Sequence, residues 1–100
     1  MGPTAKPKIL VIDDEQALVE VIREALIEEG MEVVSANNAD EGLRLFFQHQ
    51  PHLVVLDIML PGSDGWEVCR RIRQVSSLPI LMLTARSDGS DLVRGLNMGA

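Results

Sequence analysis

Three aspartates are placed so that folding could bring their carboxylates together. Asp13 and Asp14 follow the apolar run Ile9–Ile12, and Asp57 follows the apolar run Leu53–Leu56. If the two runs lie side by side as parallel strands, their carboxyl ends meet at one rim of the sheet, where open α/β sheets bind ligands. Clustered carboxylates repel one another unless a hard cation joins them. The sequence therefore predicts a divalent-metal site, with Mg²⁺ as the expected ion and one aspartate free for chemistry.

Such a site would suit phosphoryl chemistry. Three ionised aspartates and a phosphoryl group would repel one another strongly, and a bound Mg²⁺ would offset that charge. Positioning and charge neutralisation supply most of the catalysis of phosphoryl transfer, and an aspartate can itself be the nucleophile that holds an acyl phosphate. Thr84 follows another apolar run, residues 79–83, so we expect its hydroxyl at the same rim. The pattern therefore favours phosphoryl transfer onto an aspartate.

Other chemistries have weaker support. The chain has no GxxxxGK[ST] loop for a nucleoside triphosphate, and acids follow its first apolar run where a dinucleotide site would have a GxGxxG turn. His49 and His52 lack partners at zinc-ligand spacing, so we expect them to be surface polar residues. No Gly-x-Ser-x-Gly elbow is present.

Apolar runs alternate with segments of helical period, which is typical of an α/β protein with a parallel sheet. We expect strands at residues 8–12, 32–36, 53–57 and 79–83. Between the first two, apolar residues recur at helical spacing and predict a helix with one apolar stripe, formed by Leu18, Val21, Ile22, Ala25 and Leu26. Gly30 is expected just beyond the end of that helix.

Two further helices are expected between the later strands. Asn37 or Asn38 should cap the second helix, whose apolar residues are Leu43, Phe46 and Phe47. Pro61–Gly65 is a turn cluster, and the third helix that follows should face inward with Val68, Cys69 and Ile72. A weaker helix is expected at residues 87–99, where glycines lower the helix propensity.

Length and composition indicate one soluble domain. The chain has 100 residues, of which 46% are hydrophobic and 24% charged, and its net charge is −6. That charge argues against nucleic-acid binding by this segment itself. No apolar run approaches the length of a membrane span, and no signal peptide is evident, so we expect a cytoplasmic protein. Residues 1–7 are expected to be a flexible segment before a domain at 8–100.

Three stretches of the chain resemble the response-regulator receiver domains of two-component signalling. They are ILVIDDE at residues 9–15, LDIMLPGSDG at residues 56–65 and PILMLTA at residues 79–85. The resemblance covers nearly the whole chain, and the three motifs are highly specific when taken together. It implies a flavodoxin-like doubly wound parallel sheet of strand order 2-1-3-4-5.

The resemblance also implies a role for each site residue. Asp57 would accept a phosphoryl group from a sensor histidine kinase. Asp14 would bind Mg²⁺ directly and Asp13 largely through water, and the backbone carbonyl of Met59 would be a further ligand. Thr84 would move to bond a phosphoryl oxygen and so act as the switch residue.

The same resemblance suggests what surrounds the domain. The motifs are most similar to regulators of the OmpR type, which carry a winged-helix DNA-binding domain, so DNA would be bound only through an effector domain outside this chain. Met59 and Arg86 would flank the route of the attacking water and modulate hydrolysis, which should be slow. Such a domain is a signalling receiver that assists transfer to its own aspartate, and it is not an enzyme acting on other substrates.

The chain departs from the family pattern at its C-terminal end. The family has a fifth strand ending in a lysine, then a fifth helix, whereas the lysines here are Lys6 and Lys8. Lys8 begins the first strand, so it would lie at the opposite rim. We therefore expect a C-terminally truncated receiver without the family lysine, and a homodimer is possible because the strand at residues 79–83 would be a bare apolar edge.

Two other classes of function remain open. A Mg²⁺-dependent phosphohydrolase with an aspartyl nucleophile could use a similar sheet, but it would need a second acid two residues after the nucleophile, where this chain has Met59. A receiver-like interaction module that is never phosphorylated is the other class. The intact set of Asp13, Asp14, Asp57 and Thr84 argues against it.

Overall fold

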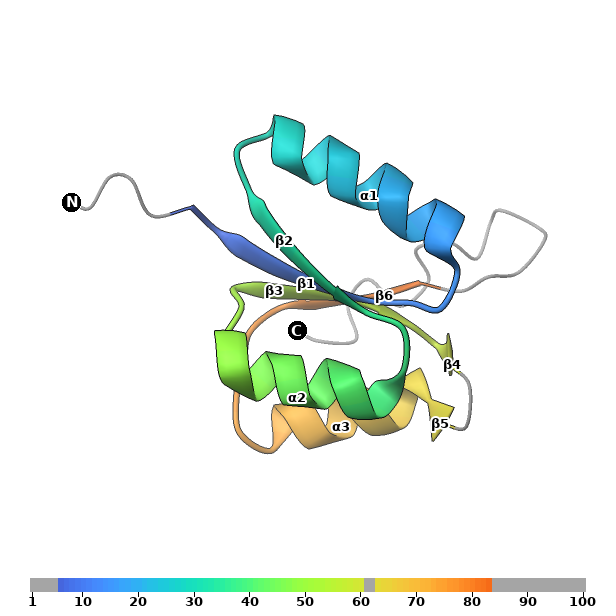
Figure 1. Cartoon of the computed structure of the whole chain (residues 1–100). Helices are drawn as coiled ribbons and strands as arrows, with labels where there is room; N and C mark the ends of the chain where they lie inside the picture. The colour runs from blue at the N-terminus through green and yellow to red at the C-terminus, as the bar shows by residue number, and fades with distance from the viewer. Residues whose placement is uncertain (1–5, 61–62, 84–100) are drawn as a thin grey trace.

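The computed structural model describes residues 6–60 and 63–83, which form a sheet with helices on both faces. Four parallel strands make up the sheet, in the order β2-β1-β3-β6. Figure 1 shows α1 on one face of this sheet and α2 with α3 on the other. The elements in chain order are β1 (Lys8–Ile12), α1 (Gln16–Glu28), β2 (Glu32–Ala36), α2 (Ala39–His49), β3 (Leu53–Asp57), β4 (Met59–Leu60), β5 (Ser63–Asp64), α3 (Gly65–Arg73) and β6 (Ile80–Leu83).

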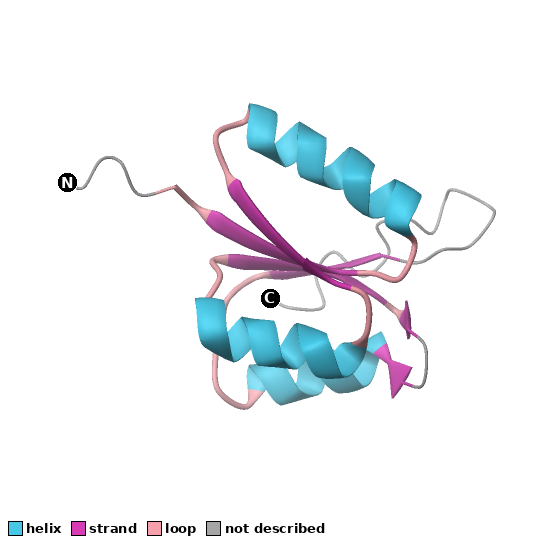
Figure 2. Ribbon diagram, viewed as in Figure 1, coloured by secondary structure: helices cyan, strands magenta, loops and turns pink. Residues whose placement is uncertain are grey.

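This arrangement confirms the flavodoxin-like doubly wound fold over the described residues (Figure 2). The first three strands have the predicted bounds, and the fourth begins at Ile80, one residue later than predicted. Pro79 has no N–H to give to a strand ladder, although its carbonyl accepts from the N–H of Val54. The short antiparallel pair β4–β5 was not predicted, because two-residue strands have no periodic signal.

The core has two layers because side chains alternate across each strand. On the side of α2 and α3, the buried residues of the four-stranded sheet are Leu10, Ile12, Ala36, Val54, Leu56, Ile80 and Met82. On the side of α1, they are Ile9, Val11, Val33 and Val55. The central strands are therefore buried on both faces, which is why they read as unbroken apolar runs in the sequence.

The apolar stripe predicted for α1 is partly wrong. The helix packs on the sheet through Val19, Ile22 and Leu26, whereas the side chain of Val21 is 65% exposed. Ala25 is exposed as well. Two overlapping stripes in this helix have helical spacing, and periodicity alone cannot decide which one faces the strands.

The apolar residues named from the sequence for α2 are not all buried. Phe46 is buried, whereas Phe47 is 58% exposed, and Leu45 is a further buried residue of this helix. The two phenylalanine rings contact edge to face, with centroids 5.1 Å apart. The predicted cap is confirmed, since the side chain of Asn38 accepts a hydrogen bond from the N–H of Glu41 at 2.8 Å.

The inward face of α3 is as predicted, because Val68, Cys69 and Ile72 are all fully buried. Its first turn is capped by Asp64, whose Oδ1 accepts from the N–H of Glu67 at 2.9 Å. The helix expected at residues 87–99 lies outside the described residues. Among the helices that are described, none is both long and apolar enough to cross a membrane.

Candidate functional site

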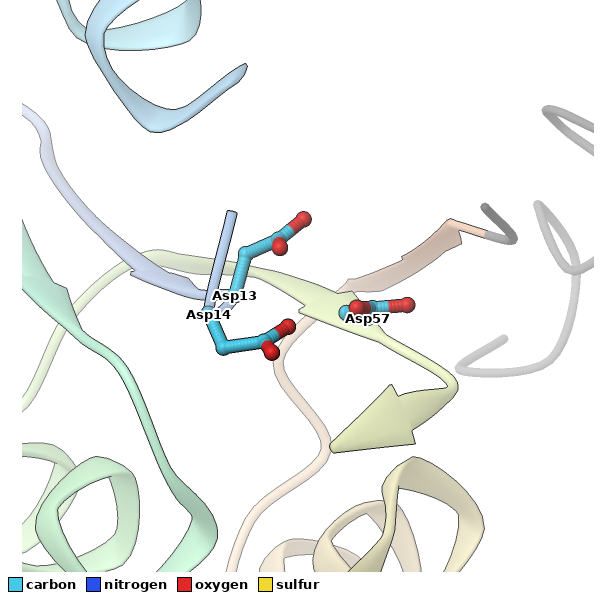
Figure 3. Close-up of side chains that lie close together, drawn as sticks. All are labelled: Asp13, Asp14 and Asp57. Carbon is cyan, nitrogen blue, oxygen red and sulfur yellow. The ribbon is translucent and has the colours of Figure 1, made fainter. Parts of the chain in front are cut away.

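The three predicted aspartates lie together at the carboxyl ends of β1 and β3. The two strands are parallel, with Ile12 opposite Leu56, so the residue after each of them falls at the same rim. One carboxylate oxygen from each of Asp13, Asp14 and Asp57 lies within 4.8 Å of the others. Figure 3 shows the three side chains gathered beside these strand ends. The parallel pairing of two acid-terminated strands thus produces the cluster.

The three carboxylates differ in exposure. Asp13 and Asp57 are only 3% and 4% exposed, whereas Asp14 is exposed to solvent. Neighbouring residues at a strand end point in different directions, so Asp13 turns inward while Asp14 stays in water. The cluster therefore has one solvent-exposed carboxylate, which an ion in solution can reach, and two that are largely removed from water.

Backbone donors hold the two buried carboxylates in place. The N–H of Glu15 donates to Oδ1 of Asp13 at 2.9 Å, and the N–H of Met59 donates to Oδ1 of Asp57 at 3.1 Å. Each of these donors lies two residues after its acceptor, so the chain that follows the strand orients the carboxylate. One oxygen of Asp57 is therefore fixed by the main chain.

Burial changes the acidity of both inward carboxyls. It raises the pKa of Asp57 to about 6, with the negative charges of Asp13 and Asp14 adding to the effect and the N–H of Met59 opposing it. The pKa of Asp13 is raised too, again chiefly by burial. Asp57 is thus still mostly ionised at neutral pH, but keeping it ionised lowers the stability of the fold, and a bound cation would offset this loss.

This loss of stability predicts that Asp57→Asn stabilises the fold in buffer free of divalent ions. The folded state holds the Asp57 proton up to about pH 6, whereas an aspartate with its ordinary pKa of 3.8 loses it at lower pH, so raising the pH through this window lowers the free energy of unfolding. At pH 7 the variant should be more stable than the parent by on the order of 2 kcal/mol, and at pH 3.5 the gain should vanish. Urea unfolding at both pH values measures it.

Glu28→Gln is a matched control for this experiment. Glu28 is an exposed acid at the other end of the molecule, in the last turn of α1. Its replacement should change the stability by less than about 0.5 kcal/mol at either pH. A gain for Asp57→Asn that is the same at pH 3.5 as at pH 7 would show that the charge of Asp57 is not its source.

The start of α3 lies directly against the backbone of the Asp57 segment. The N–H of Ile58 donates to the carbonyl of Leu83 at 2.9 Å, and the N–H of Gly65 donates to the carbonyl of Ile58 at 2.6 Å. The segment that follows Asp57 is therefore held between β6 and α3. Sequence reasoning assigned Gly65 to a turn cluster and missed this contact. The sequence feature that could have indicated this contact is a helix-capping aspartate, Asp64, followed directly by a glycine.

The donor set fits a hard divalent cation. Mg²⁺ prefers oxygen ligands from one or two carboxylates and keeps several waters, and the cluster offers buried and exposed carboxylate oxygens together. Asp57 and Met59 are placed by the structure as described above, whereas Thr84 and Arg86 lie outside the described residues. The roles assigned to all these residues from the sequence stay predictions.

The sequence profile of the response regulator receiver domain matches residues 9–100. The chain belongs to the receiver-domain family. Two curated relatives are a transcriptional regulatory protein, AfsQ1, from Streptomyces coelicolor and a probable transcriptional regulator, ycf27, from Porphyridium aerugineum. The first is 47% identical over 94 residues, which are 94% of this chain and 42% of the relative. The second is 47% identical over 95 residues, or 95% of this chain and 40% of the relative.

Solved structures agree with this assignment. The receiver has a TM-score of 0.76 to the response regulator protein TrrA from Thermotoga maritima, a crystal structure in complex with Mg(2+)-BeF. The two are 44% identical, and the match covers 87% of this chain and 77% of that one. The receiver spans only about two fifths of the length of the curated relatives. It is thus the receiver domain of a two-component response regulator, a class of signalling domain.

Proposed function

We propose that this receiver takes a phosphoryl group onto Asp57. The observation that carries the proposal is the placement of Asp57, a 4%-exposed carboxylate at the end of β3 that lies beside Asp13 and Asp14. A carboxylate largely removed from water, with one oxygen fixed by the N–H of Met59, is a well-oriented nucleophile. Its pKa of about 6 leaves it mostly ionised at neutral pH.

In the proposed step, the oxygen of Asp57 that does not accept from the N–H of Met59 attacks the phosphorus of the donor. An O–P bond forms while the bond from phosphorus to the leaving group breaks. The leaving group takes a proton from solvent or from the donor molecule. With a phosphorylated histidine as the donor, the leaving group is the imidazole. The buried position of Asp57 limits the access of water, which suits an acyl phosphate that must survive long enough to carry a signal.

We also propose Mg²⁺ as the cofactor, held by carboxylate oxygens of Asp13, Asp14 and Asp57 and by the carbonyl of Met59. The ion would supply positive charge that offsets the repulsion between the carboxylates and the incoming phosphoryl oxygens. Asp14, which is exposed, would contribute a direct ligand, and Asp13 would act largely through water. The crystal of TrrA with Mg(2+)-BeF supports this choice of ion.

The wider role follows from the family and from the names of the relatives. A sensor histidine kinase is the proposed phosphoryl donor, and the proposed output is transcription through a DNA-binding domain outside this chain, in the cytoplasm. Both curated relatives named above are transcriptional regulators. Thr84 is the proposed switch residue, and Arg86 a proposed modulator of hydrolysis. Residues 8–100 are proposed as the receiver unit.

A mass measurement tests the phosphoacceptor role. The chain is incubated with acetyl phosphate and Mg²⁺, and its intact mass is followed with time and after treatment with hydroxylamine, which cleaves acyl phosphates. We expect one phosphoryl adduct that hydroxylamine removes. Turnover of acetyl phosphate without an adduct would indicate a phosphohydrolase. A chain that neither gains mass nor consumes the donor would indicate an interaction module.

Hydrolysis of the adduct should be slow, and Met59→Asn should make it several-fold faster. Met59 is two residues past the acceptor and 60% exposed, so its side chain lies on the open side of the loop. A thioether gives an attacking water no useful hydrogen bond, whereas an amide can orient it. Decay of the adduct by intact mass compares the two chains, with Met59→Leu as the apolar control. Equal decay of the asparagine and leucine variants would remove Met59 as a modulator.

A further inference from the structure

We propose that Gly65 is a positioning residue for phosphoryl transfer, because it lets the first turn of α3 sit directly on the main chain of the acceptor. This inference rests on the proposed function of Asp57. Gly65 is buried and is the first residue of α3. Its N–H donates to the carbonyl of Ile58 at 2.6 Å, so the helix and the residue after Asp57 are joined backbone to backbone.

Space is the reason for a glycine at this position. A Cβ added to Gly65 would overlap the carbonyl oxygen of Asp57 and would lie 2.8 Å from the Cα of Ile58 and 3.0 Å from the carbonyl carbon of Asp57. Those atoms are main chain and cannot rotate away as a side chain can. The backbone of Gly65 is helical, and in a helix alanine is favoured over glycine. Neither propensity nor a positive φ therefore accounts for the glycine.

The atoms that a Cβ would displace are those that orient the acceptor. The carboxylate of Asp57 is fixed by the N–H of Met59, and Met59 pairs with Asp64 in the short β4–β5 ladder just before Gly65. On its other side the segment is bonded to β6 through Ile58 and Leu83. With β6 behind it, the Asp57–Met59 backbone has little room to move away from an added Cβ. If α3 moves instead, it pulls on Met59 through the β4–β5 pair, so in either case the N–H that holds Asp57 is displaced. A displacement of about 1 Å at a reacting group can cost about a hundredfold in rate.

Gly42 provides a matched control. It is the other buried glycine within a helix among the described residues, and a Cβ there would meet the side chain of Ile12, with Cδ1 at 2.6 Å. A side-chain end can move where a backbone cannot. Gly42→Ala therefore perturbs packing in the same sheet layer without pressing on the acceptor backbone.

The test compares Gly65→Ala and Gly42→Ala in the full chain. We expect adduct formation from acetyl phosphate to slow by roughly tenfold or more in Gly65→Ala, and the Mg²⁺ concentration for half-maximal rate to rise, while Gly42→Ala stays within about twofold of the parent. Thermal unfolding of both variants separates these effects from lost stability. A Gly65→Ala chain that is phosphorylated as fast as Gly42→Ala overturns the proposal.

A second readout works even if the parent is never phosphorylated. Hydrogen exchange of the Met59 amide reports its bond to Asp57 directly, and we expect faster exchange in Gly65→Ala but not in Gly42→Ala. If Gly65→Ala does not fold, Asp64→Ala takes its place, because it removes the cap of the first turn of α3 without adding an atom. Parent-like protection of the Met59 amide in the folded variant overturns the positioning role. An unphosphorylated parent overturns only the phosphoacceptor role.

Discussion

Asp57→Asn should yield a folded chain that forms no hydroxylamine-labile adduct with acetyl phosphate and Mg²⁺. The amide keeps the size of the side chain, and its oxygen can still accept from the N–H of Met59, so the local structure should survive. An amide is a far weaker nucleophile than a carboxylate and cannot form the acyl phosphate. Intact mass before and after hydroxylamine, with circular dichroism as the check on folding, gives the answer.

Glu28→Gln also removes one negative charge, but in the last turn of α1, at the other end of the molecule from Asp57. This variant should be phosphorylated like the parent. Any loss in that variant would point to net charge and not to the acceptor. If Asp57→Asn keeps a labile adduct of unchanged yield, the acceptor is another residue. Asp13 and Asp14 would be the first to examine, because a carboxylate oxygen of each lies within 4.8 Å of one of Asp57.

Asp14→Asn should weaken Mg²⁺ binding by at least about tenfold, equal to about 1.4 kcal/mol. Asp14 is the exposed carboxylate of the cluster, so it can bind the ion directly from solution without being buried. Its loss removes a direct ligand and one negative charge. Calorimetry measures the affinity, and the fluorescence of Trp66, which is partly buried beside Gly65 at the start of α3, offers a second signal.

Glu15→Gln is the control at the neighbouring position. Glu15 is the residue before α1, and its side chain makes no capping hydrogen bond. It lies outside the group of carboxylates that converge on one point, so its replacement should change the affinity for Mg²⁺ less than about threefold, through the long-range charge alone. Equal losses of affinity in the two variants would mean that the ion responds to the overall negative charge at this rim of the sheet and not to a defined ligand.

The strands and the gathering of the three aspartates could be predicted from the sequence, and the orientation of the helices only in part. A buried parallel strand needs unbroken apolar residues, so β1 and β3 were recognisable together with the acids that end them. Helical period does not distinguish the stripe of Val19 from that of Val21, because neighbouring stripes share Ile22. Which one is buried depends on the rotation of α1 over the sheet, which is set by tertiary packing.

The unequal burial of the site was also beyond the sequence. Asp13 and Asp14 are adjacent and identical in type, yet one is 3% exposed and the other faces solvent. That difference comes from the direction in which the chain leaves β1 and from the N–H of Glu15 that holds Asp13. The close approach of Gly65 to Asp57 joins residues eight positions apart through a loop whose path no local pattern fixes.

The pairing of β1 with β3 means that the ligand cluster exists only while the sheet is intact. An ion that binds the assembled cluster and not the unfolded chain adds stability as the logarithm of its concentration, about 2.7 kcal/mol at a hundredfold excess over Kd. The melting temperature of this chain then becomes a gauge of free magnesium. Asp57→Asn and Asp14→Asn should flatten its response, and a chelator should lower the melting temperature of the parent more than that of either variant.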